Sequence, residues 1–406
     1  MYKRTLKETV EKTSRTFPAV MITGPRQVGK TTLFETCAED RRGYVSLDNL
    51  EARTIAQNDP GLFIQSYPPP VIIDEVQYAP DLFSHIKIVI DREKKNGLYW
   101  LTGSQKFHLM KGITESLAGR VALINLLGLS QAEIDGRSNG TPFLPTAEWI
   151  KKTRQAVTKP LPLMSVFERI WTGSFPKLYQ EKDVSRDTFY QSYLATYIQR
   201  DVKDILAISD ETAFLRFLRA VAARTSELLN YADMARDVGI DQKTAKAWLS
   251  VLETAGLVYL LQPYYSNVTN RLVKTPKLYF LDTGLCSYLT KWPTVETLEA
   301  GSMSGALLET YVFSEVLKSY WHNGIEPNFY YYRDTDQKEV DLVIESGGTL
   351  YPVEIKKTGT PSRTASKHFT ALEKLGKKIG HGVVLCFVPE DVPLSKDVTA
   401  VPIGYL

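Results

Sequence analysis

Short apolar runs alternate with helical stretches over the first third of the chain. Residues 19–22, 71–73 and 98–101 are such runs, and polar residues or glycine follow each of them. A continuous apolar run is typical of a strand in a parallel sheet, because helices cover both faces of such a sheet. The pattern therefore predicts an α/β domain over residues 1–132, with a parallel sheet covered by helices.

A polar segment rich in glycine and proline follows at residues 133–162, and it predicts a linker or lid. Helical periodicity returns over residues 163–229. The residues expected in the core of this helical region are Trp171, Phe175, Tyr193, Tyr197 and Ile198.

Residues 230–265, the first part of a predicted domain that spans 230–290, have the pattern of a helix-turn-helix unit. A short helix at 231–236 leads through a turn into a second helix at 242–254, for which Asp241 is the expected N-cap. An apolar strand at 257–261 follows, as in a winged helix. The sequence therefore predicts a winged-helix-like domain over this region.

Two lysines, Lys243 and Lys246, fall on the exposed face of the second predicted helix. In this position they could contact phosphates beside a groove of DNA. Winged helices also serve as plain connectors between domains, so DNA contact and a connecting role both stay open.

The C-terminal part, residues 291–406, contains a predicted β-hairpin. Its strands at 339–344 and 351–356 flank a turn at Gly347-Gly348. This arrangement predicts a second α/β domain, separate from the parallel sheet of the N-terminal part.

The octapeptide Gly24–Thr31 fits the pattern G-x-x-x-x-G-K-[ST] and stands between a predicted strand and a predicted helix. Glycines let backbone N–H groups surround phosphate oxygens, and the helix N-terminus adds partial positive charge. Lys30 would reach the β- and γ-phosphates of ATP, and the Thr31 hydroxyl would ligate Mg²⁺. The residues expected to bind the nucleotide are Gly24, Pro25, Arg26, Gln27, Val28, Gly29, Lys30, Thr31 and Thr32.

Two carboxylates, Asp74 and Glu75, end the apolar run that starts at Val71. A buried parallel strand delivers acids to its C-terminal edge in this way. Asp74 would hold Mg²⁺, and Glu75 would orient or deprotonate the attacking water. Together with the phosphate-binding loop, this pair predicts an ATP-hydrolysing site.

Further groups for this site follow along the chain. Ser104 or Gln105, at the end of the third predicted strand, could sense the γ-phosphate. Arg120 comes after a predicted helix at 107–117, and it suits a residue donated to the γ-phosphate of a neighbouring subunit. A surface arginine at a helix end is the alternative, and Arg26 inside the loop is a rival for the phosphate contact.

Several strings resemble AAA-type ATPases of bacteria and archaea that carry a C-terminal domain of unknown function. These strings are residues 24–33, 73–77, 101–104, 116–120, 197–202, 279–285, 339–341 and 353–356. The resemblance covers nearly the whole chain, and it implies an AAA-type fold and ATP binding. Gln105 departs from the asparagine expected there. Arg200 and Asp201 are interpreted first as an ion pair between domains and second as part of the ATP site.

The predicted hairpin carries a second chemical signal. Glu354 and Lys356 share one face of their strand, and Asp341 lies on the other strand. Two carboxylates with a lysine can hold Mg²⁺ and activate water for phosphodiester hydrolysis. The pattern resembles the core of PD-(D/E)xK nucleases, which implies a restriction-endonuclease-like domain, with Asp341 and Glu354 as metal ligands. Glu309, on a predicted helix at 306–318, matches the additional acid. A half-buried hairpin with charged edges, or a nuclease scaffold without activity, would give the same pattern.

Composition narrows the class of protein only modestly. Hydrophobic residues make up 43% and charged residues 23%, which is ordinary for a globular chain. The net charge is +3, but residues 356–378 hold seven Lys or Arg and one acid, which favours a polyanion or a solvated helix face. The isolated Cys37, Cys286 and Cys386 indicate a reducing compartment. We expect a cytoplasmic protein without a membrane segment, because no apolar run approaches about 18 residues.

Two functions are consistent with these features. The first is an ATPase that acts on DNA through the winged helix and the nuclease-like domain. The alternative is an ATP-dependent regulatory switch that binds a protein partner, with an inactive C-terminal domain as the interaction module. A role for Arg120 across subunits would require a homo-oligomer.

Overall fold

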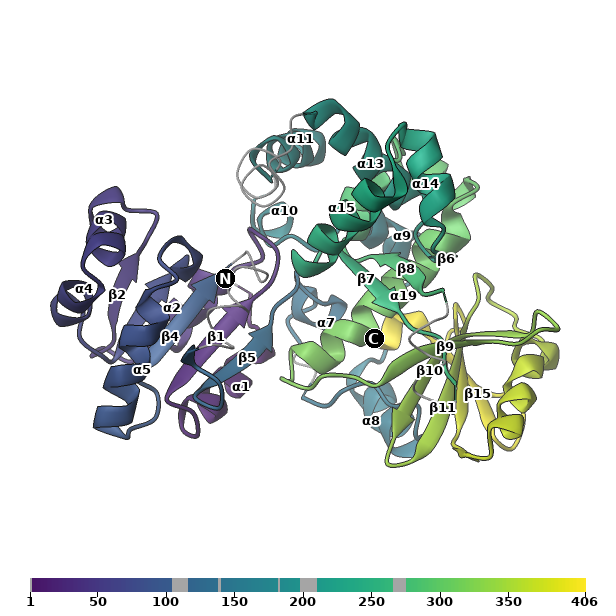
Figure 1. Cartoon of the computed structure of the whole chain (residues 1–406). Coiled ribbons are helices and arrows are strands. Elements are labelled where there is room, and N and C mark those ends of the chain that lie inside the picture. Colours follow the sequence, from purple (N-terminus) through teal and green to yellow (C-terminus); the bar gives the residue numbers. More distant parts are fainter. Residues whose placement is uncertain (1, 104–115, 138–139, 182, 198–209, 266–274) are drawn as a thin grey trace.

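The computed structural model describes residues 2–103, 116–137, 140–181, 183–197, 210–265 and 275–406. Three sheets organise these residues (Figure 1): a five-stranded sheet in the N-terminal part, a small three-stranded sheet in the middle and a seven-stranded sheet in the C-terminal part. The predicted parallel sheet and the predicted separate C-terminal sheet are both confirmed.

The N-terminal sheet has the strand order β2-β3-β4-β1-β5, and its neighbouring strands run parallel. Its strands are β1 (Ala19–Thr23), β2 (Gly43–Ser46), β3 (Val71–Asp74), β4 (Tyr99–Gly103) and β5 (Val121–Asn125). The helices around it are α1 (Leu6–Ser14), α2 (Lys30–Cys37), α3 (Leu50–Asn58), α4 (Pro60–Ser66), the 3₁₀ turn η1 (Val76–Tyr78), α5 (Leu82–Glu93) and α7 (Gln131–Ile134).

Alternate residues of β1 enter two different cores, as expected of a sheet covered on both faces. Val20 and Ile22 pack in one cluster with Leu6 of α1 and Phe34 of α2. Residues on the other face, such as Met21, pack with side chains of α3, α4 and α5. Helices α1 and α2 therefore cover one face of the sheet, and α3 to α5 cover the other. The loop Gly24–Thr31 follows the C-terminal end of β1, at the edge of the sheet where β3 also ends.

The segment predicted as a linker or lid contains helix α8 (Ala147–Ala156), which the sequence did not indicate. Thr146 caps this helix by accepting a hydrogen bond from the Trp149 N–H. Phe143 and Ile150 are buried in the larger core, so this part of the segment is packed onto the rest of the chain.

The described residues between 163 and 223 are largely helical, as predicted, but the predicted helical region ran to 229 and the structure has a short strand at 227–228. The elements of the middle of the chain are α9 (Leu163–Thr172), α10 (Lys177–Gln180), α11 (Arg186–Tyr197), α13 (Glu211–Ala223), β6 (Glu227–Leu228), α14 (Tyr231–Val238), α15 (Gln242–Thr254), β7 (Val258–Leu261), β8 (Lys277–Phe280), α17 (Thr283–Leu289) and α18 (Val295–Ala300). The two helices predicted at 231–236 and 242–254 are present as α14 and α15, and Asp241 caps α15 as expected. Strand β8 pairs antiparallel with both β6 and β7.

The C-terminal sheet is mixed and has the order β14-β15-β13-β11-β10-β9, with β12 beside β11. Its elements are α19 (Ser304–Trp321), β9 (Phe329–Arg333), β10 (Glu339–Ser346), β11 (Thr349–Ile355), the 3₁₀ helix η3 (Arg363–Leu375), β12 (Lys378–Ile379), β13 (Gly382–Cys386), β14 (Val392–Pro393), β15 (Val398–Pro402) and the 3₁₀ turn η4 (Ile403–Tyr405). Strands β10 and β11 form the predicted hairpin.

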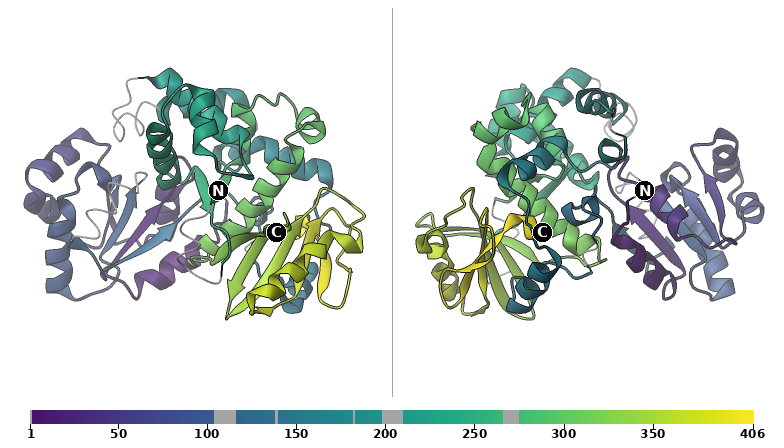
Figure 2. Two further views of the ribbon diagram at one scale, coloured as in Figure 1. Left: turned by 45° about the vertical axis from the view of Figure 1, so that its right-hand side comes forward. Right: turned by 180° about the vertical axis from the view of Figure 1, so that it is seen from behind.

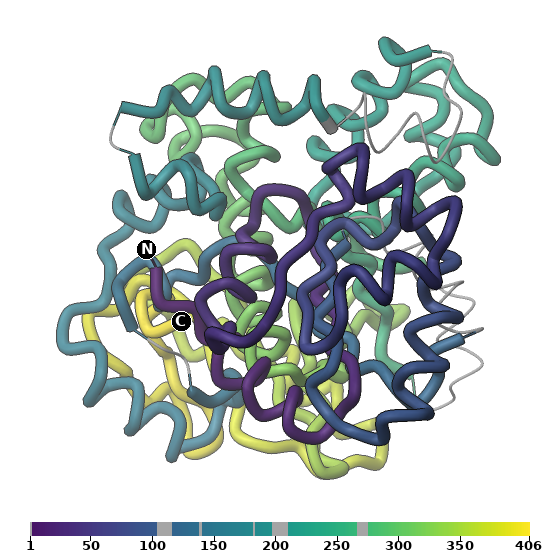
Figure 3. The backbone as a smooth tube through the Cα atoms, turned by 90° about the vertical axis from the view of Figure 1, so that its left-hand side faces the viewer, coloured from purple at the N-terminus to yellow at the C-terminus, as the bar shows by residue number. Residues whose placement is uncertain are grey.

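Helix α19 lies between the C-terminal sheet and the rest of the molecule, and it is buried along most of its length (Figure 2). Its side chains share one continuous core with α1, α2, the middle helices and one face of the C-terminal sheet. Figure 3 shows the N-terminal unit facing the viewer, with the C-terminal sheet behind it. No helix among the described residues is both long and apolar enough to cross a membrane.

A buried polar network joins the N-terminal residues to α19. The fully buried Glu133 carboxylate accepts a hydrogen bond from Thr5 N at 2.8 Å. It also lies 3.4 Å from Arg4 Nε and 3.5 Å from Nδ1 of His322, at the end of α19. Burial alone would raise the pKa of Glu133, but Arg4 and then His322 hold it well below its ordinary value. The ionised carboxylate of Glu133 therefore links Arg4 and Thr5 to the end of α19 by charge as well as by hydrogen bonding.

Candidate nucleotide site and C-terminal acidic cluster

The loop between β1 and α2 depends on its two motif glycines. Gly24 has φ = 147°, and a Cβ placed on it would lie 2.0 Å from the carbonyl oxygen of Leu126. Gly29 has φ = 92°, in the left-handed region, immediately before the helix begins at Lys30. Glycine adopts both conformations without the steric cost that a side chain would carry. The backbone thus turns directly into the N-terminus of α2.

Lys30 and Thr31, the first residues of α2, point toward the loop and the end of β3. Lys30 Nζ donates hydrogen bonds to the carbonyl oxygens of Gly24, at 3.0 Å, and Pro25, at 2.8 Å. Thr31 Oγ1 donates to Asp74 Oδ1 at 2.8 Å. The structure therefore brings Lys30, Thr31 and Asp74 together, as the sequence predicted.

Asp74 has two further partners that the sequence did not indicate. Thr102, on the neighbouring strand β4, donates a hydrogen bond to the same Oδ1 atom. The hydroxyl of Tyr44, on β2, lies 3.3 Å from Oδ2. Burial, and then the Asp74 carboxylate, raise the pKa of Tyr44 to about 12, so this hydroxyl remains a donor at neutral pH.

Glu75 follows β3 in a left-handed conformation, with φ = 55°. Its backbone N–H donates to Thr102 Oγ1 at 3.1 Å. Its carboxylate accepts a hydrogen bond from Gln77 and lies 3.8 Å from the guanidinium of Arg26, within the loop. Arg26 therefore contacts Glu75, which links the loop to the end of β3.

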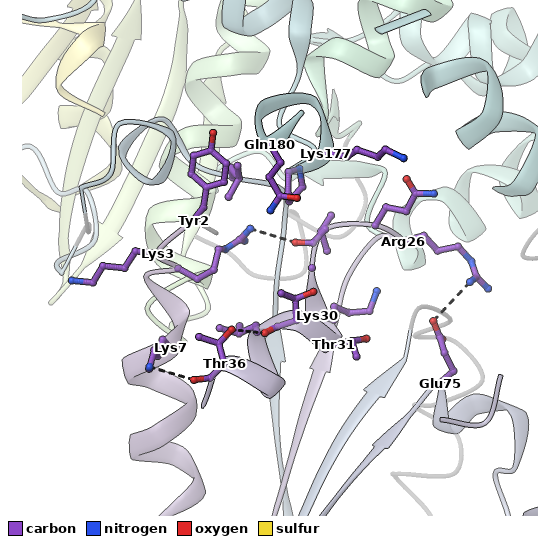
Figure 4. Close-up of a pocket in the computed structure, with 18 of the residues that line it drawn as sticks. Tyr2, Lys3, Lys7, Arg26, Lys30, Thr31, Thr36, Glu75, Lys177 and Gln180 are labelled. Carbon is purple, nitrogen blue, oxygen red and sulfur yellow. Dashed lines mark hydrogen bonds and ion pairs between the residues drawn. The ribbon is translucent and has the colours of Figure 1, made fainter. Parts of the chain in front are cut away.

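A cavity of about 1000 Å³ lies over the loop (Figure 4). The predicted binding residues that line it are Arg26, Gln27, Val28, Gly29, Lys30, Thr31 and Thr32, and Glu75 lies at its edge. Gly24 and Pro25 shape the loop but do not line the cavity. The opposite side of the cavity is closed by residues that the sequence did not indicate: Tyr2, Lys3, Pro176, Lys177, Gln180 and Thr196. These residues belong to the N-terminal segment and to α10 and α11, and no local pattern links them to the loop.

The remaining predicted groups of this site are placed as follows. Arg120 forms an ion pair with Asp91 of α5, with Nε 2.7 Å from Oδ1 and Nη2 3.1 Å from Oδ2. Its side chain is 34% exposed, and it does not line the cavity. Ser104, Gln105 and the Arg200-Asp201 pair lie outside the described residues, as does most of the helix predicted at 107–117.

The helix-turn-helix unit touches the loop through Gly256, which follows α15. Gly256 has φ = 73°, and a Cβ placed on it would lie 3.1 Å from Cδ of Pro25. Lys243 and Lys246 are exposed on α15, as predicted. The helix that presents these lysines thus ends beside the ring of Pro25 in the loop.

The acids of the C-terminal hairpin lie side by side. The pairing of Leu342 with Val353 places Asp341 opposite Glu354 on neighbouring strands. Asp341 Oδ2 accepts a hydrogen bond from the Ile355 N–H at 2.9 Å, and Glu354 Oε1 lies 2.6 Å from Lys356 Nζ. The predicted grouping of Asp341, Glu354 and Lys356 on one side of the hairpin is thus present.

Glu309 comes from α19, and its partners are residues that the sequence pattern did not single out. Lys277 Nζ lies 2.7 Å from Glu309 Oε1 and 2.8 Å from Glu339 Oε1. The Tyr279 hydroxyl donates to the same Glu309 oxygen at 2.6 Å. Lys277 and Tyr279 alternate along β8, so both side chains reach one face. A lysine at the head of an apolar strand was the signal that could have found them. We call Lys277, Glu309, Glu339, Asp341, Glu354 and Lys356 the acidic cluster.

Burial dominates the electrostatics of the acidic cluster. Burial, and then the Glu309 and Glu354 carboxylates, raise the pKa of Asp341 well above its ordinary value. Burial also raises the pKa of Glu354, although Lys356 opposes this effect. Glu354 Oε2 is a buried oxygen without a hydrogen-bond partner among the described residues. Within the described ranges, no group of three or more His, Cys, Asp or Glu side chains is arranged to hold a metal ion.

Three families match successive parts of the chain. Residues 16–135 match a family described as AAA domain. Residues 164–296 and 304–406 match two domains of unknown function, DUF8612 and DUF4143. The first match, together with the parallel sheet and its loop, identifies an AAA-type P-loop ATPase domain in the N-terminal part.

Two curated relatives are similar over almost the whole chain. They are uncharacterised proteins of Mycobacterium bovis and Mycobacterium tuberculosis, each 28% identical over 390 residues. The match covers 95% of this chain and 80% of each relative.

Solved structures with some similarity include a Walker-type ATPase of Pyrococcus abyssi, with 15% identity and a TM-score of 0.44, covering 70% of this chain and 95% of that protein. The RuvB Holliday junction branch migration motor of Thermotoga maritima has 14% identity and a TM-score of 0.30, covering 63% and 88%. AMPPCP-bound DnaA of Aquifex aeolicus has 14% identity and a TM-score of 0.30, covering 61% and 85%.

Proposed function

We propose that this chain binds and hydrolyses ATP with Mg²⁺ in the cavity over the β1–α2 loop. The hydrogen bond of Thr31 to Asp74 carries the proposal, because it places a hydroxyl and a carboxylate oxygen 2.8 Å apart beside Lys30. Hard oxygen ligands of this kind suit Mg²⁺. Thr31 and Asp74 would hold the ion, and the ion would neutralise phosphate charge.

The other groups have separate roles in this proposal. The Lys30 ammonium bonds to loop carbonyls and would exchange them for phosphate oxygens when ATP binds. Glu75 would orient the attacking water, and its contacts with Arg26 and Gln77 fix its carboxylate at the cavity edge. The binding loop and the water-activating acid are therefore joined by one ion pair.

Measured phosphate release tests the proposal. Lys30→Ala should abolish ATP hydrolysis, because it removes the cation nearest the phosphates. Lys95→Ala is the matched control, since Lys95 is an exposed lysine of the same unit, at the end of α5. Hydrolysis at the wild-type rate by the Lys30 variant would exclude this site as the source of activity.

We further propose that nucleotide state acts on DNA through α14 and α15. The contact of Gly256 with Pro25 supports this coupling, because a change in the loop would press on the end of α15. The exposed Lys243 and Lys246 on the same helix are suited to phosphate contacts. An ATP-dependent change in their position would then alter affinity for DNA.

DNA binding at low salt tests this second step, since phosphate contacts are strongest there. Replacing Lys243 and Lys246 with alanine should weaken binding and reduce the salt slope by about 2. Replacing the exposed Lys151 and Lys152 on α8 is the control for a general loss of charge. Absence of binding to duplex and single-stranded DNA at low salt would reject the DNA proposal while leaving ATP hydrolysis intact.

A protein-directed regulatory switch is the second candidate, with the C-terminal domain as an inactive interaction module. The ion pairs of Glu309 with Lys277 and of Glu354 with Lys356 favour it, because both acids already have a cation. The adjacent Asp341 and Glu354, with Glu309 on α19, support a nuclease-like scaffold. Cleavage of linear, circular and single-stranded DNA in Mg²⁺, with and without ATP, separates the two candidates. Cleavage that Asp341→Asn abolishes would exclude the inactive module.

A further inference from the structure

Lys277 is the least exposed cation of the acidic cluster. It lies at the start of β8, outside the hairpin and α19, and only 4% of the residue is exposed. Its ammonium nitrogen is within 2.8 Å of carboxylate oxygens from two different elements, Glu309 on α19 and Glu339 on β10. One side chain of the middle sheet therefore joins two elements of the C-terminal part.

The electrostatics keep this lysine charged. Burial alone would lower the pKa of Lys277, but Tyr279, Glu309, Asp341 and Glu339 together raise it well above its ordinary value. A buried ammonium without counter-charges would be strongly destabilising. The acids thus stabilise Lys277, and Lys277 stabilises the acids.

A divalent cation would compete for the same oxygens. Mg²⁺ requires near-octahedral oxygen ligands at about 2.0–2.1 Å. Glu309 Oε1 already bonds to Lys277 and Tyr279, and Asp341 Oδ2 bonds to the Ile355 N–H. Glu354 Oε1 bonds to Lys356. Glu354 Oε2 has no hydrogen-bond partner among the described residues, but one such oxygen does not supply the octahedral ligand set that Mg²⁺ requires. The arrangement therefore fits a resident ammonium and does not fit the Mg²⁺ site that the resemblance to nucleases implies.

We infer that Lys277 is the built-in cation of the acidic cluster, and that it closes the cluster to divalent metal ions. The cluster holds four carboxylates and two ammonium groups, and removal of the Lys277 charge leaves Lys356 as its one remaining cation. A divalent ion then binds at the position that the Lys277 ammonium occupied. This property concerns the acidic cluster and is independent of ATP hydrolysis.

The test measures Mn²⁺ binding and thermal unfolding of the full chain without nucleotide, after treatment with a chelator. Wild-type protein should show no Mn²⁺-dependent shift in Tm that Asp341→Asn removes. Lys277→Met, which keeps the side-chain length without the charge, should have a lower Tm in chelator. Saturating Mn²⁺ should then raise that Tm by about 5 °C or more. Lys277→Arg keeps the charge and should not respond to Mn²⁺.

The Asp341→Asn substitution tests whether a Mn²⁺-dependent shift in Tm comes from this cluster. Mn²⁺ bound at Thr31 and Asp74 would not depend on Asp341. The shift gained by Lys277→Met should vanish in the double variant with Asp341→Asn. A wild-type Mn²⁺ shift that Asp341→Asn removes would overturn the inference, as would a folded Lys277→Met that gains no Mn²⁺ binding. If Lys277→Met does not fold, Lys277→Gln, which can still donate to Glu309, is subject to the same criteria.

Discussion

The contact between Gly256 and Pro25 predicts that ATP affinity depends on the end of α15. Gly256→Ala introduces a Cβ 3.1 Å from Cδ of Pro25, closer than ordinary van der Waals contact. One of the two segments must then move by a few tenths of an ångström. Because Pro25 belongs to the phosphate-binding loop, part of this strain should act on the nucleotide site.

The chain offers a matched control for backbone strain. Gly239, which follows α14, has φ = 80°, close to the 73° of Gly256, but a Cβ placed on it would have no described heavy atom within 4 Å. Either alanine costs about 1 kcal/mol from the left-handed backbone. Overpacking adds about 1–3 kcal/mol only at Gly256. If about 1 kcal/mol of this acts on the loop, the Kd for ATP rises about fivefold.

Titration with a fluorescent ATP analogue gives the two Kd values, and urea unfolding gives the two stabilities. Gly256→Ala should weaken ATP binding about fivefold relative to Gly239→Ala, although both variants lose stability. Equal ATP affinity in the two variants would refute coupling of α15 to the loop, because only the position of the added methyl group differs.

Other substitutions test the individual groups. Glu75→Gln should bind ATP but hydrolyse it very slowly, because Glu75 acts on the water; hydrolysis at the wild-type rate would remove that role. If Arg120 acts across subunits, turnover should rise with protein concentration and Arg120→Ala should lower it without a change in ATP affinity. Equal losses in Arg120→Ala and Asp91→Ala would instead identify a structural ion pair. Glu133→Gln should cost about 3 kcal/mol, because it leaves the buried Arg4 without its counter-charge. Since Glu133 has a lowered pKa in the folded state, its contribution is present above about pH 4.3 and is lost as the pH falls further, so acid unfolding should be shallower in the variant.

Local signals were sufficient to predict the phosphate-binding loop and helices α14 and α15. Gly24 and Gly29 adopt conformations that favour glycine, and the spacing of the motif fixes where α2 begins. Asp241 caps α15, whose observed bounds agree with the prediction to the residue. In each case the relevant interactions join residues that are near in sequence, so a single stretch of sequence contains the information.

Long-range contacts could not be predicted in the same way. Tyr2, Lys177 and Gln180 line the cavity only because the N-terminal segment and α10 fold over the loop. Lys277 reaches Glu309 across 32 positions, and it was overlooked because a lysine at a strand end ordinarily remains in water. Helix α8 was missed because glycines and prolines around it dominate the pattern of its segment.

Helix α19 joins the acidic cluster to the buried network of Glu133, which contacts the loop of the candidate nucleotide site through Arg4. Its 18 residues span about 27 Å at 1.5 Å per residue. One end places Glu309 in the acidic cluster, and the other places His322 against Glu133 and the Leu127 N–H. Arg4 bonds to both the Val28 carbonyl in the loop and the Glu133 carboxylate, and Glu133 lies against His322 at the end of α19. If nucleotide binding moves the loop, these contacts would form a continuous path to the helix that carries Glu309.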